Sequence, residues 1–434
     1  MARNMKDSGI EWIGKIPEGW EIRKIKNNFM IYAGATPKSE KTEYWDGGIP
    51  WITPADFKTT DKYVSSGRKS LTALGYDSCG TTLVPAGSII FSKRAPVGSV
   101  VIAKNTLCTN QGCLACIPND AVNSTYFYYC MSIFTEQFEL VSAGTTFKEI
   151  AASTFASFLL PCPPLSQQNE IVNFLDKESS RIDSMLSKTR SSIEEYKKLK
   201  QAVITQAVTK GVRGEREMKD SGVEWIGEIP KKWNRCKLNS ICTFINGDRS
   251  KNYPSSEDFQ DIGIPFIGAD SLNGFFVDTY SARHISPAKY ASMGGLKITQ
   301  GDILYTLRGS TIGKNAIANF NDGTIASSLV GIRVKSPFLA SSSFLFYWLN
   351  SLNEFVQRDL CINGSTAPNL SAENVAQFFI YIPDITEQHE IADYLDAKCA
   401  EIDRLIAKKE QLVKELESYK KSLIYEVVTG KREV

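Results

Sequence analysis

Two long segments without internal glycine or proline most constrain what this chain can fold into. The first begins at Leu165 and ends at Gly211. Its apolar or aromatic residues recur in two interleaved seven-residue series: Leu175, Ile182, Tyr196 and Val203 form one, and Leu186 and Ile193 form the other. Alternating steps of four and three residues produce the seam of a coiled coil. At 1.5 Å per residue the helix would be roughly 60–70 Å long, so its seam needs a partner helix.

The partner is predicted to lie in the same chain. The segment from Thr386 to Gly430 repeats the pattern at an offset of 220 positions, which relates Gln168 to Gln388. Every matched seam position is apolar: Leu395, Ile402, Ile406, Val413, Leu416 and Leu423. Lys200 is a polar residue within the first seam. Because each segment follows a globular region, we expect an intramolecular coiled coil that acts as a spacer.

A shorter repeat marks the start of each globular region. Residues 5–20 contain Trp-Ile-Gly-Lys-Ile-Pro-Glu-Gly-Trp, and residues 218–233 contain Trp-Ile-Gly-Glu-Ile-Pro-Lys-Lys-Trp. We expect the tryptophans of both copies to be packing anchors between domain and helix, namely Trp12, Trp20, Trp225 and Trp233. The C-terminal residues 428–434 resemble the connector 212–217. This circular order predicts termini close in space and a pseudo-twofold axis through antiparallel helices.

The two globular regions match each other more loosely. Both contain short β-type runs bounded by glycine and proline, such as 88–91 and 378–382. Helical segments are predicted near 125–140 and 341–360. The expected fold class is α/β (α+β), with two domains separated by two long antiparallel helices. The predicted boundaries are 1–164 for the first domain, 165–212 for the first helix, 213–384 for the second domain and 385–434 for the second helix.

Composition narrows the partners and the compartment. The 434 residues carry a net charge of +2, whereas a non-specific nucleic-acid binder is usually far more basic. If DNA is the partner, shape and base contacts must therefore contribute more of the recognition. The sequence contains no signal-peptide core and no apolar run of about 18 residues, so we expect a cytoplasmic protein without a membrane span. The ten cysteines should be reduced and mostly packed.

Motifs for catalysis or for metal and nucleotide binding are weak. A DNA methyltransferase needs a glycine-rich cofactor loop and an Asn/Asp-Pro-Pro-aromatic motif, and neither is present. The segment 309–315 resembles a phosphate-binding loop but is one residue short, so we interpret it as a turn. Cys108, Cys113 and Cys116 have iron–sulfur spacing, but the second domain has no counterpart and the segment also fits a buried strand. A protein-binding scaffold and an autonomous DNA enzyme remain as alternatives.

The duplicated order of these motifs, with the helix starts Gln-Gln-x-Glu-Ile and Glu-Gln-x-Glu-Ile, resembles the specificity subunit of type I restriction-modification systems. The resemblance implies that each globular region is a target-recognition domain for one half of a split double-stranded DNA site. It implies that the helices set the half-site separation and dock methyltransferase (modification) subunits. The family's complex methylates adenine with S-adenosylmethionine and, with ATP-driven restriction subunits, cleaves unmethylated DNA.

The same resemblance implies that this chain is not an enzyme and binds no cofactor itself. S-adenosylmethionine, ATP and Mg are expected on the partner subunits. Because the two domains have diverged while the helices have not, we expect the two half-sites to differ. The DNA site should then be asymmetric and bipartite.

Side chains that contact DNA are expected on loops between strands, where polar and basic groups can reach bases or phosphates. In the first domain the candidates are Lys38, Lys41, Thr53, Lys58, Lys93, Arg94, Gln111, Thr145, Thr146 and Lys148. In the second domain they are Arg249, Lys251, Tyr253, Arg283, Arg308, Lys314, Ser365, Thr366 and Asn369. Arg94 and Arg308 follow matched strands, which favours phosphate or scaffold contacts for this pair. A solvated charge or a turn residue is the alternative for each candidate.

Overall fold

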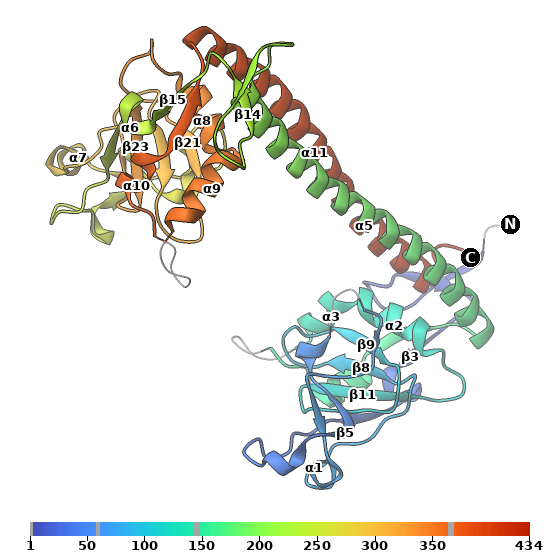
Figure 1. Ribbon diagram of the computed structural model, residues 1–434. Coiled ribbons are helices and arrows are strands. Elements are labelled where there is room, and N and C mark those ends of the chain that lie inside the picture. Colours follow the sequence, from blue (N-terminus) through green and yellow to red (C-terminus); the bar gives the residue numbers. More distant parts are fainter. Residues whose placement is uncertain (1–2, 58–60, 143–147, 363–368) are drawn as a thin grey trace. The chain divides into compact units, whose positions relative to one another are not determined.

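The computed structural model describes residues 3–57, 61–142, 148–362 and 369–434 (Figure 1). The chain divides into two compact units. Unit 1 comprises Met1–Thr189 and Gln411–Val434, and unit 2 comprises Arg190–Glu410. Each unit contains one globular domain and a part of each long helix. Throughout the described ranges, no helix is both long and apolar enough to cross a membrane.

The two long helices are present as predicted. Helix α5 (Leu165–Lys210) has 46 residues and helix α11 (Ile385–Val428) has 44; Figure 1 shows them in green and red. Gly211 follows α5 with φ of +76°, and Gly430 lies just beyond α11 with φ of +72°. Glycine adopts this left-handed conformation without strain, which is why it ends so many helices.

The seam residues of both helices lie inside the units. Leu175 and Leu423 belong to the core of unit 1, whereas Val203 packs against the core of unit 2, which contains Leu395. The start of α5 therefore lies beside the end of α11 in unit 1, and the reverse holds in unit 2, so the helices are antiparallel. The fully buried seam residues are Leu175, Ile182, Leu186, Ile193, Leu395, Ile402 and Leu423. The half-buried ones are Tyr196, Val203, Ile406, Val413 and Leu416.

A matched ion pair joins the helices in each unit. Lys420 Nζ lies 2.6 Å from Asp183 in unit 1, and Lys200 Nζ lies 2.7 Å from Asp403 in unit 2. The offset of 220 that relates the repeats converts each pair into the other. Lys200, the polar residue in the predicted seam, is thus paired across the helices. Such half-exposed pairs stabilise by only about 0–1 kcal/mol, so their main effect is on the register of the helices.

Domain 1 (residues 5–162) is built on two sheets. The larger has the spatial order β4 (Phe29–Ala33), β11 (Cys113–Pro118), β8 (Ile89–Ser92), β9 (Val100–Ala103) and β6 (Tyr63–Val64). The smaller has the order β10 (Cys108–Thr109), β5 (Trp45–Ile52) and β7 (Lys69–Leu71). Among the described strands of domain 1, only β6–β9 and β10–β5 pair in parallel. Two-stranded pairs join β1 (Met5–Asp7) to β2 (Lys15–Pro17) and β3 (Glu21–Lys24) to β12 (Leu159–Cys162).

Domain 2 (residues 218–382) repeats this topology in part: among the described residues its first sheet has four strands where that of domain 1 has five, and its second has four where that of domain 1 has three. One sheet has the order β16 (Cys242–Asn246), β23 (Leu329–Val334), β20 (Ile303–Thr306) and β21 (Asn315–Ile317). The other has the order β17 (Phe259–Gln260), β19 (Arg283–Ile285), β18 (Ile264–Ile267) and β22 (Thr324–Ile325), with β18 and β22 parallel. The small pairs are β13 (Met218–Asp220) with β14 (Glu228–Pro230) and β15 (Asn234–Lys237) with β24 (Phe379–Ile382).

Short helices cover the sheets. Domain 1 contains α1 (Ala73–Asp77), α2 (Ser124–Ile133), α3 (Thr135–Leu140) and α4 (Ala152–Ser157). Domain 2 contains α6 (Leu238–Ile241), α7 (Pro287–Ser292), α8 (Ser342–Leu349), α9 (Leu352–Cys361) and α10 (Ala372–Gln377). The two predicted helical segments are therefore confirmed, but each is broken into two helices. The two-domain α/β fold with two long helices is confirmed as well.

Candidate nucleic-acid interface and domain–helix joints

In each domain, a turn with the same backbone hydrogen bond and the same glycine conformation follows a matched strand. Turn 1 (93–99) joins β8 to β9, and turn 2 (307–314) joins β20 to β21. The Gly98 N–H donates to the Ser92 carbonyl at 3.0 Å, and the Gly313 N–H donates to the Thr306 carbonyl at 3.0 Å. Both glycines have positive φ, +90° and +89°. This hydrogen bond and glycine conformation are common to both domains. Turn 2 is one residue longer than turn 1 and carries different side chains.

A second segment lies along each turn in the same way. Arg94 forms a backbone bridge with Glu149, and Arg308 forms one with Asn369. The Ile150 N–H donates to the Lys93 carbonyl at 3.0 Å, and in domain 2 the Leu370 N–H donates to the Leu307 carbonyl at 3.0 Å. The arginine pair expected from the matched strands therefore occupies one equivalent position in the two domains.

The charge around this equivalent position differs. In domain 1, Lys93 Nζ lies 2.8 Å and Arg94 Nε 2.9 Å from the carboxylate of Glu149. Hydrogen bonds from these side chains, chiefly from Lys93, lower the pKa of Glu149, which therefore stays ionised. Domain 2 has the neutral Asn369 at the matching position. Arg308 is exposed and forms no ion pair with the residues that the structure describes.

Three other candidates in domain 1 lie on its surface. Lys38 and Lys148 are exposed, and Lys41 is exposed beside Glu43, with 3.4 Å between the charged atoms. Lys38 and Lys41 lie between β4 and β5, at a distance in sequence from turn 1. These residues are available to a polyanion.

Two candidates in domain 1 make internal hydrogen bonds. The Thr53 hydroxyl donates to Asp56 at 2.7 Å and caps a short 3₁₀ turn (Pro54–Asp56). The Gln111 side chain accepts a hydrogen bond from the Thr36 hydroxyl. Five further candidates lie outside the described residues: Lys58, Thr145, Thr146, Ser365 and Thr366.

Several candidates of domain 2 are exposed, and others are anchored. Arg249, Lys251 and Asn369 are exposed, and Arg249 also donates to the Ser327 carbonyl at 3.4 Å. Lys314 donates from Nζ to Asn273 at 2.7 Å and to the Ala269 carbonyl at 3.1 Å. Its ammonium group therefore ties turn 2 to the neighbouring sheet.

Two aromatic contacts hold other candidates of domain 2. The Arg283 guanidinium lies 4.1 Å from the centroid of the Phe259 ring. Tyr253 packs edge-on against Phe266 with ring centroids 5.7 Å apart. Arg283 as a whole remains exposed, whereas Tyr253 is partly buried against the core.

The weaker motifs have structural explanations. Cys108, Cys113 and Cys116 are buried on β10 and β11, and burial raises the pKa of each thiol, that of Cys108 to about 12. No group of three or more His, Cys, Asp or Glu side chains in the described ranges is arranged to hold a metal. The phosphate-loop-like segment 309–315 is turn 2 and the first residue of β21, in agreement with its interpretation as a turn.

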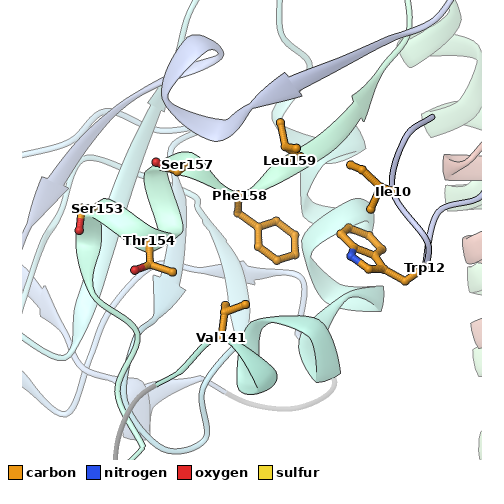
Figure 2. A pocket seen from close by; sticks show the side chains of 8 residues that line it. All are labelled: Ile10, Trp12, Val141, Ser153, Thr154, Ser157, Phe158 and Leu159. Carbon is orange, nitrogen blue, oxygen red and sulfur yellow. The ribbon is translucent and has the colours of Figure 1, made fainter.

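A groove of about 600 Å³ lies beside the first tryptophan motif (Figure 2). Trp12 stacks on Phe158 there, with ring centroids 5.4 Å apart. Apolar residues and hydroxyl groups line it: Ile10, Trp12, Val141, Ser153, Thr154, Ser157, Phe158 and Leu159. These eight residues supply no titratable group for acid–base chemistry.

Each domain is joined to the start of a long helix by a buried glutamine. Gln168 accepts from the Asn123 N–H at 2.8 Å and donates to the Pro163 carbonyl at 2.9 Å. In unit 2, Gln388 accepts from the Ser341 N–H at 2.9 Å and donates to the Pro383 carbonyl at 3.1 Å. Both glutamines are at most 1% exposed. The repeated Gln of the helix-start motif is therefore a clasp between helix and domain.

A tyrosine–aspartate pair forms a second joint. Tyr129 donates to Asp176 at 2.6 Å in unit 1, and Tyr347 donates to Asp396 at 2.5 Å in unit 2. Lys62 also lies 2.6 Å from Asp176. Burial raises the pKa of both tyrosines, so they remain protonated donors. Sequence reasoning missed these pairs, although the offset of 220 already related the two aspartates.

The tryptophan motifs form a third joint. The Trp20 indole N–H donates to Gln167 at 2.7 Å, and Trp233 donates to Glu387 at 3.3 Å. Both indoles are 1% exposed. An arginine lies over each ring, Arg3 in unit 1 and Arg216 in unit 2. Trp20 and Trp233 are packing anchors as expected, whereas Trp225 remains 38% exposed.

Two domains with largely the same strand order, each fixed to the antiparallel helices by the same three joints, define a duplicated two-domain class of protein. The family described as type I restriction modification DNA specificity domain matches residues 17–195 and 230–416. The chain belongs to this family and carries its domain twice.

Individual relatives agree with this assignment. The type I restriction enzyme MjaIX specificity subunit of Methanocaldococcus jannaschii is 28% identical over 384 residues, covering 86% of this chain and 84% of the relative. A chain from a solved structure of a type I R-M system has a TM-score of 0.74 at 17% identity, covering 96% of this chain and 99% of the other. The HsdS subunit from Thermoanaerobacter tengcongensis has a TM-score of 0.53 at 16% identity, with coverage of 96% and 98%. These two structures are similar in fold.

Proposed function

We propose that this chain is the non-catalytic specificity subunit of a type I restriction-modification complex, and that each domain recognises one half of an asymmetric, bipartite DNA site. The observation that carries the proposal is the pair of turns, in which one backbone frame carries different side chains in the two domains. Turns with the same backbone conformation but different side chains suit two domains that recognise different DNA sequences. Base-edge contacts supply sequence specificity, whereas contacts such as those of Arg94 and Arg308 position the protein on phosphates.

The helix pair supports the second part of the proposal. Helix α5 is 46 residues long, or about 69 Å at 1.5 Å per residue. We propose that this helix pair sets the half-site separation and that its outer faces bind modification subunits. S-adenosylmethionine, ATP and Mg would act on those partners and on the restriction subunits.

Selection from a random duplex DNA pool tests the proposal. The chain is incubated with the pool alone and together with modification subunits from the same source organism, and the bound DNA is sequenced. The expected result is enrichment of two different short sequences separated by a spacer of fixed length. Enrichment of a single uninterrupted sequence, or of none, contradicts the proposal. Transfer of a labelled methyl group by the chain alone contradicts its non-catalytic part.

A further inference from the structure

The two domains differ beneath their turns. In domain 1, Phe91 of β8 lies in an aromatic cluster, with ring centroids 4.8 Å from Phe138 and 4.3 Å from Phe155. The matching residue of domain 2 is Tyr305 of β20, which donates a hydrogen bond to Glu354 of α9. Both tyrosine and glutamate are buried, with Glu354 3% exposed. A polar cluster thus replaces an aromatic one at the same place in the fold.

Arg358 completes this cluster and reaches turn 2. Its Nε lies 3.0 Å from Glu354 Oε1, and one of its terminal nitrogens donates to the Ile312 carbonyl at 2.7 Å. The Arg358 side chain is only 15% exposed. A Cβ added to Gly313 would lie 2.6 Å from the guanidinium carbon, so the turn rests directly on the arginine. Glu354 is thus ion-paired with Arg358, and Arg358 is hydrogen-bonded to the backbone of turn 2.

Turn 1 has a neutral support at the same position. A Cβ added to Gly98 would lie 2.8 Å from the Thr135 methyl carbon, at the start of α3. The matched glycines therefore contact corresponding helices, but through a threonine in domain 1 and through an ion-paired arginine in domain 2. Buried ion pairs add little net stability compared with apolar packing, so stability alone does not account for the substitution.

We propose that Arg358, held by Glu354, is a positioning residue that fixes turn 2 for base-specific contact with the half-site of domain 2. This inference rests on the proposed function, because it assumes that turn 2 meets DNA. It predicts that recognition of the two half-sites depends on different side-chain contacts beneath the two turns. Changes at Arg358 or Glu354 should alter the specificity of domain 2 and leave that of domain 1 intact.

The test is the random-pool selection with the chain and its modification subunits. The half-site of domain 2 is first identified as the one that persists when domain 1 is exchanged for that of a relative. Arg358→Gln should then lower the base preference at one or more positions of this half-site by about tenfold, the size of one lost bidentate base contact. Glu354→Gln should weaken the same positions when the selection is carried out at about pH 8, where the Glu354 carboxyl is ionised. Arg358→Lys, which retains the charge, should lose less.

Asp359→Asn is the matched control, because it removes one negative charge from the exposed face of the same helix. It should change neither half-site. Circular dichroism establishes that each variant is folded, and if Arg358→Gln is not, the milder Arg358→Lys decides.

Two results overturn the inference: both half-sites keep their preferences in the folded variants, or both relax together. If the wild-type chain enriches no bipartite site, the proposed function itself has failed. A bipartite wild-type site that Arg358 and Glu354 variants leave unchanged removes the positioning role alone.

Discussion

At the scale of single residues, the equivalent arginines of the two turns stand in different electrostatic surroundings. Glu149 already neutralises much of the charge of Arg94, whereas Asn369 leaves the charge of Arg308 uncompensated. The sequence identified both arginines because the strands before them match. It could not predict the difference, since the bridge partners are 55 and 61 residues further along the chain.

This difference predicts unequal phosphate contacts. Arg308→Gln should reduce the slope of log binding constant against log salt concentration by about 0.9, the value for one released counterion. Arg94→Gln should reduce it by less, because that arginine must exchange Glu149 for a phosphate. Binding of specific duplex DNA at several salt concentrations between about 50 and 200 mM measures both slopes. Equal reductions would contradict this account of the two arginines.

Burial of Glu354 gives a prediction about pH. Burial raises the pKa of Glu354 from 4.5 to about 7, and Arg358 and Tyr305 only partly oppose this shift. The carboxyl group therefore binds its proton more tightly in the folded state than in the unfolded state. Its contribution to stability is complete below pH 4.5 and is lost as pH rises to about 7. The full change is at most about 3 kcal/mol.

Glu354→Gln should remove this pH-dependent contribution. The free energy of unfolding in urea, measured at about pH 4.5 and pH 8, should fall less for Glu354→Gln than for the wild type. Asp359→Asn serves again as the exposed control and should follow the wild type. Equal pH dependence in the wild type and Glu354→Gln would show that the Glu354 carboxyl is not shifted by burial.

At the scale of elements, the long helices were predictable because heptad spacing is a local signal. The predicted first helix, 165–212, and the observed α5 differ only at the C-terminal end. Sheet topology could not be predicted, because it depends on pairs such as β4 with β11, which are separated by most of domain 1. The repeated Gln of the helix start was visible as a motif, but its role required the position of Asn123 or Ser341.

The glutamine clasp predicts how firmly each domain is fixed to its helix. Gln388→Leu should lower the stability of unit 2 by about 2–3 kcal/mol, because the Ser341 N–H and the Pro383 carbonyl lose their buried partner. Gln168→Leu should have a similar effect on unit 1. Urea unfolding measures both, with the exposed neighbour His389→Gln as control. A loss of stability below about 0.5 kcal/mol for both leucine variants would show that these glutamines do not fix the domains to the helices.

At the scale of the whole molecule, the circular order of the motifs has a structural counterpart. In unit 1 the Tyr425 hydroxyl near the end of α11 donates to the Trp12 carbonyl at 3.0 Å, and a Cβ on Gly430 would clash with Pro17. Both ends of the described chain therefore meet at the first tryptophan motif. In unit 2 the uninterrupted connector 212–217 takes the place of the two chain ends. Arg216 lies over Trp233 there, as Arg3 lies over Trp20 in unit 1.

This arrangement predicts that the chain tolerates circular permutation. Joining the C-terminus to the N-terminus through a short linker and opening the connector 213–217 should preserve both half-sites and their spacer. Random-pool selection with the permuted chain is the measurement. A permuted chain that folds but recognises only one half-site would contradict the equivalence of the two connections. The sequence repeats predicted this equivalence, whereas the residues that make each joint required the structure.

In the proposed function, two independent recognition domains share one helix pair. The most direct measurement exchanges residues 21–158 of domain 1 for the corresponding segment of a relative and repeats the random-pool selection. We expect that one half-site changes completely, while the other half-site and the spacer length remain those of the wild type. A change in both half-sites, or a change in the spacer with the helices untouched, would contradict it.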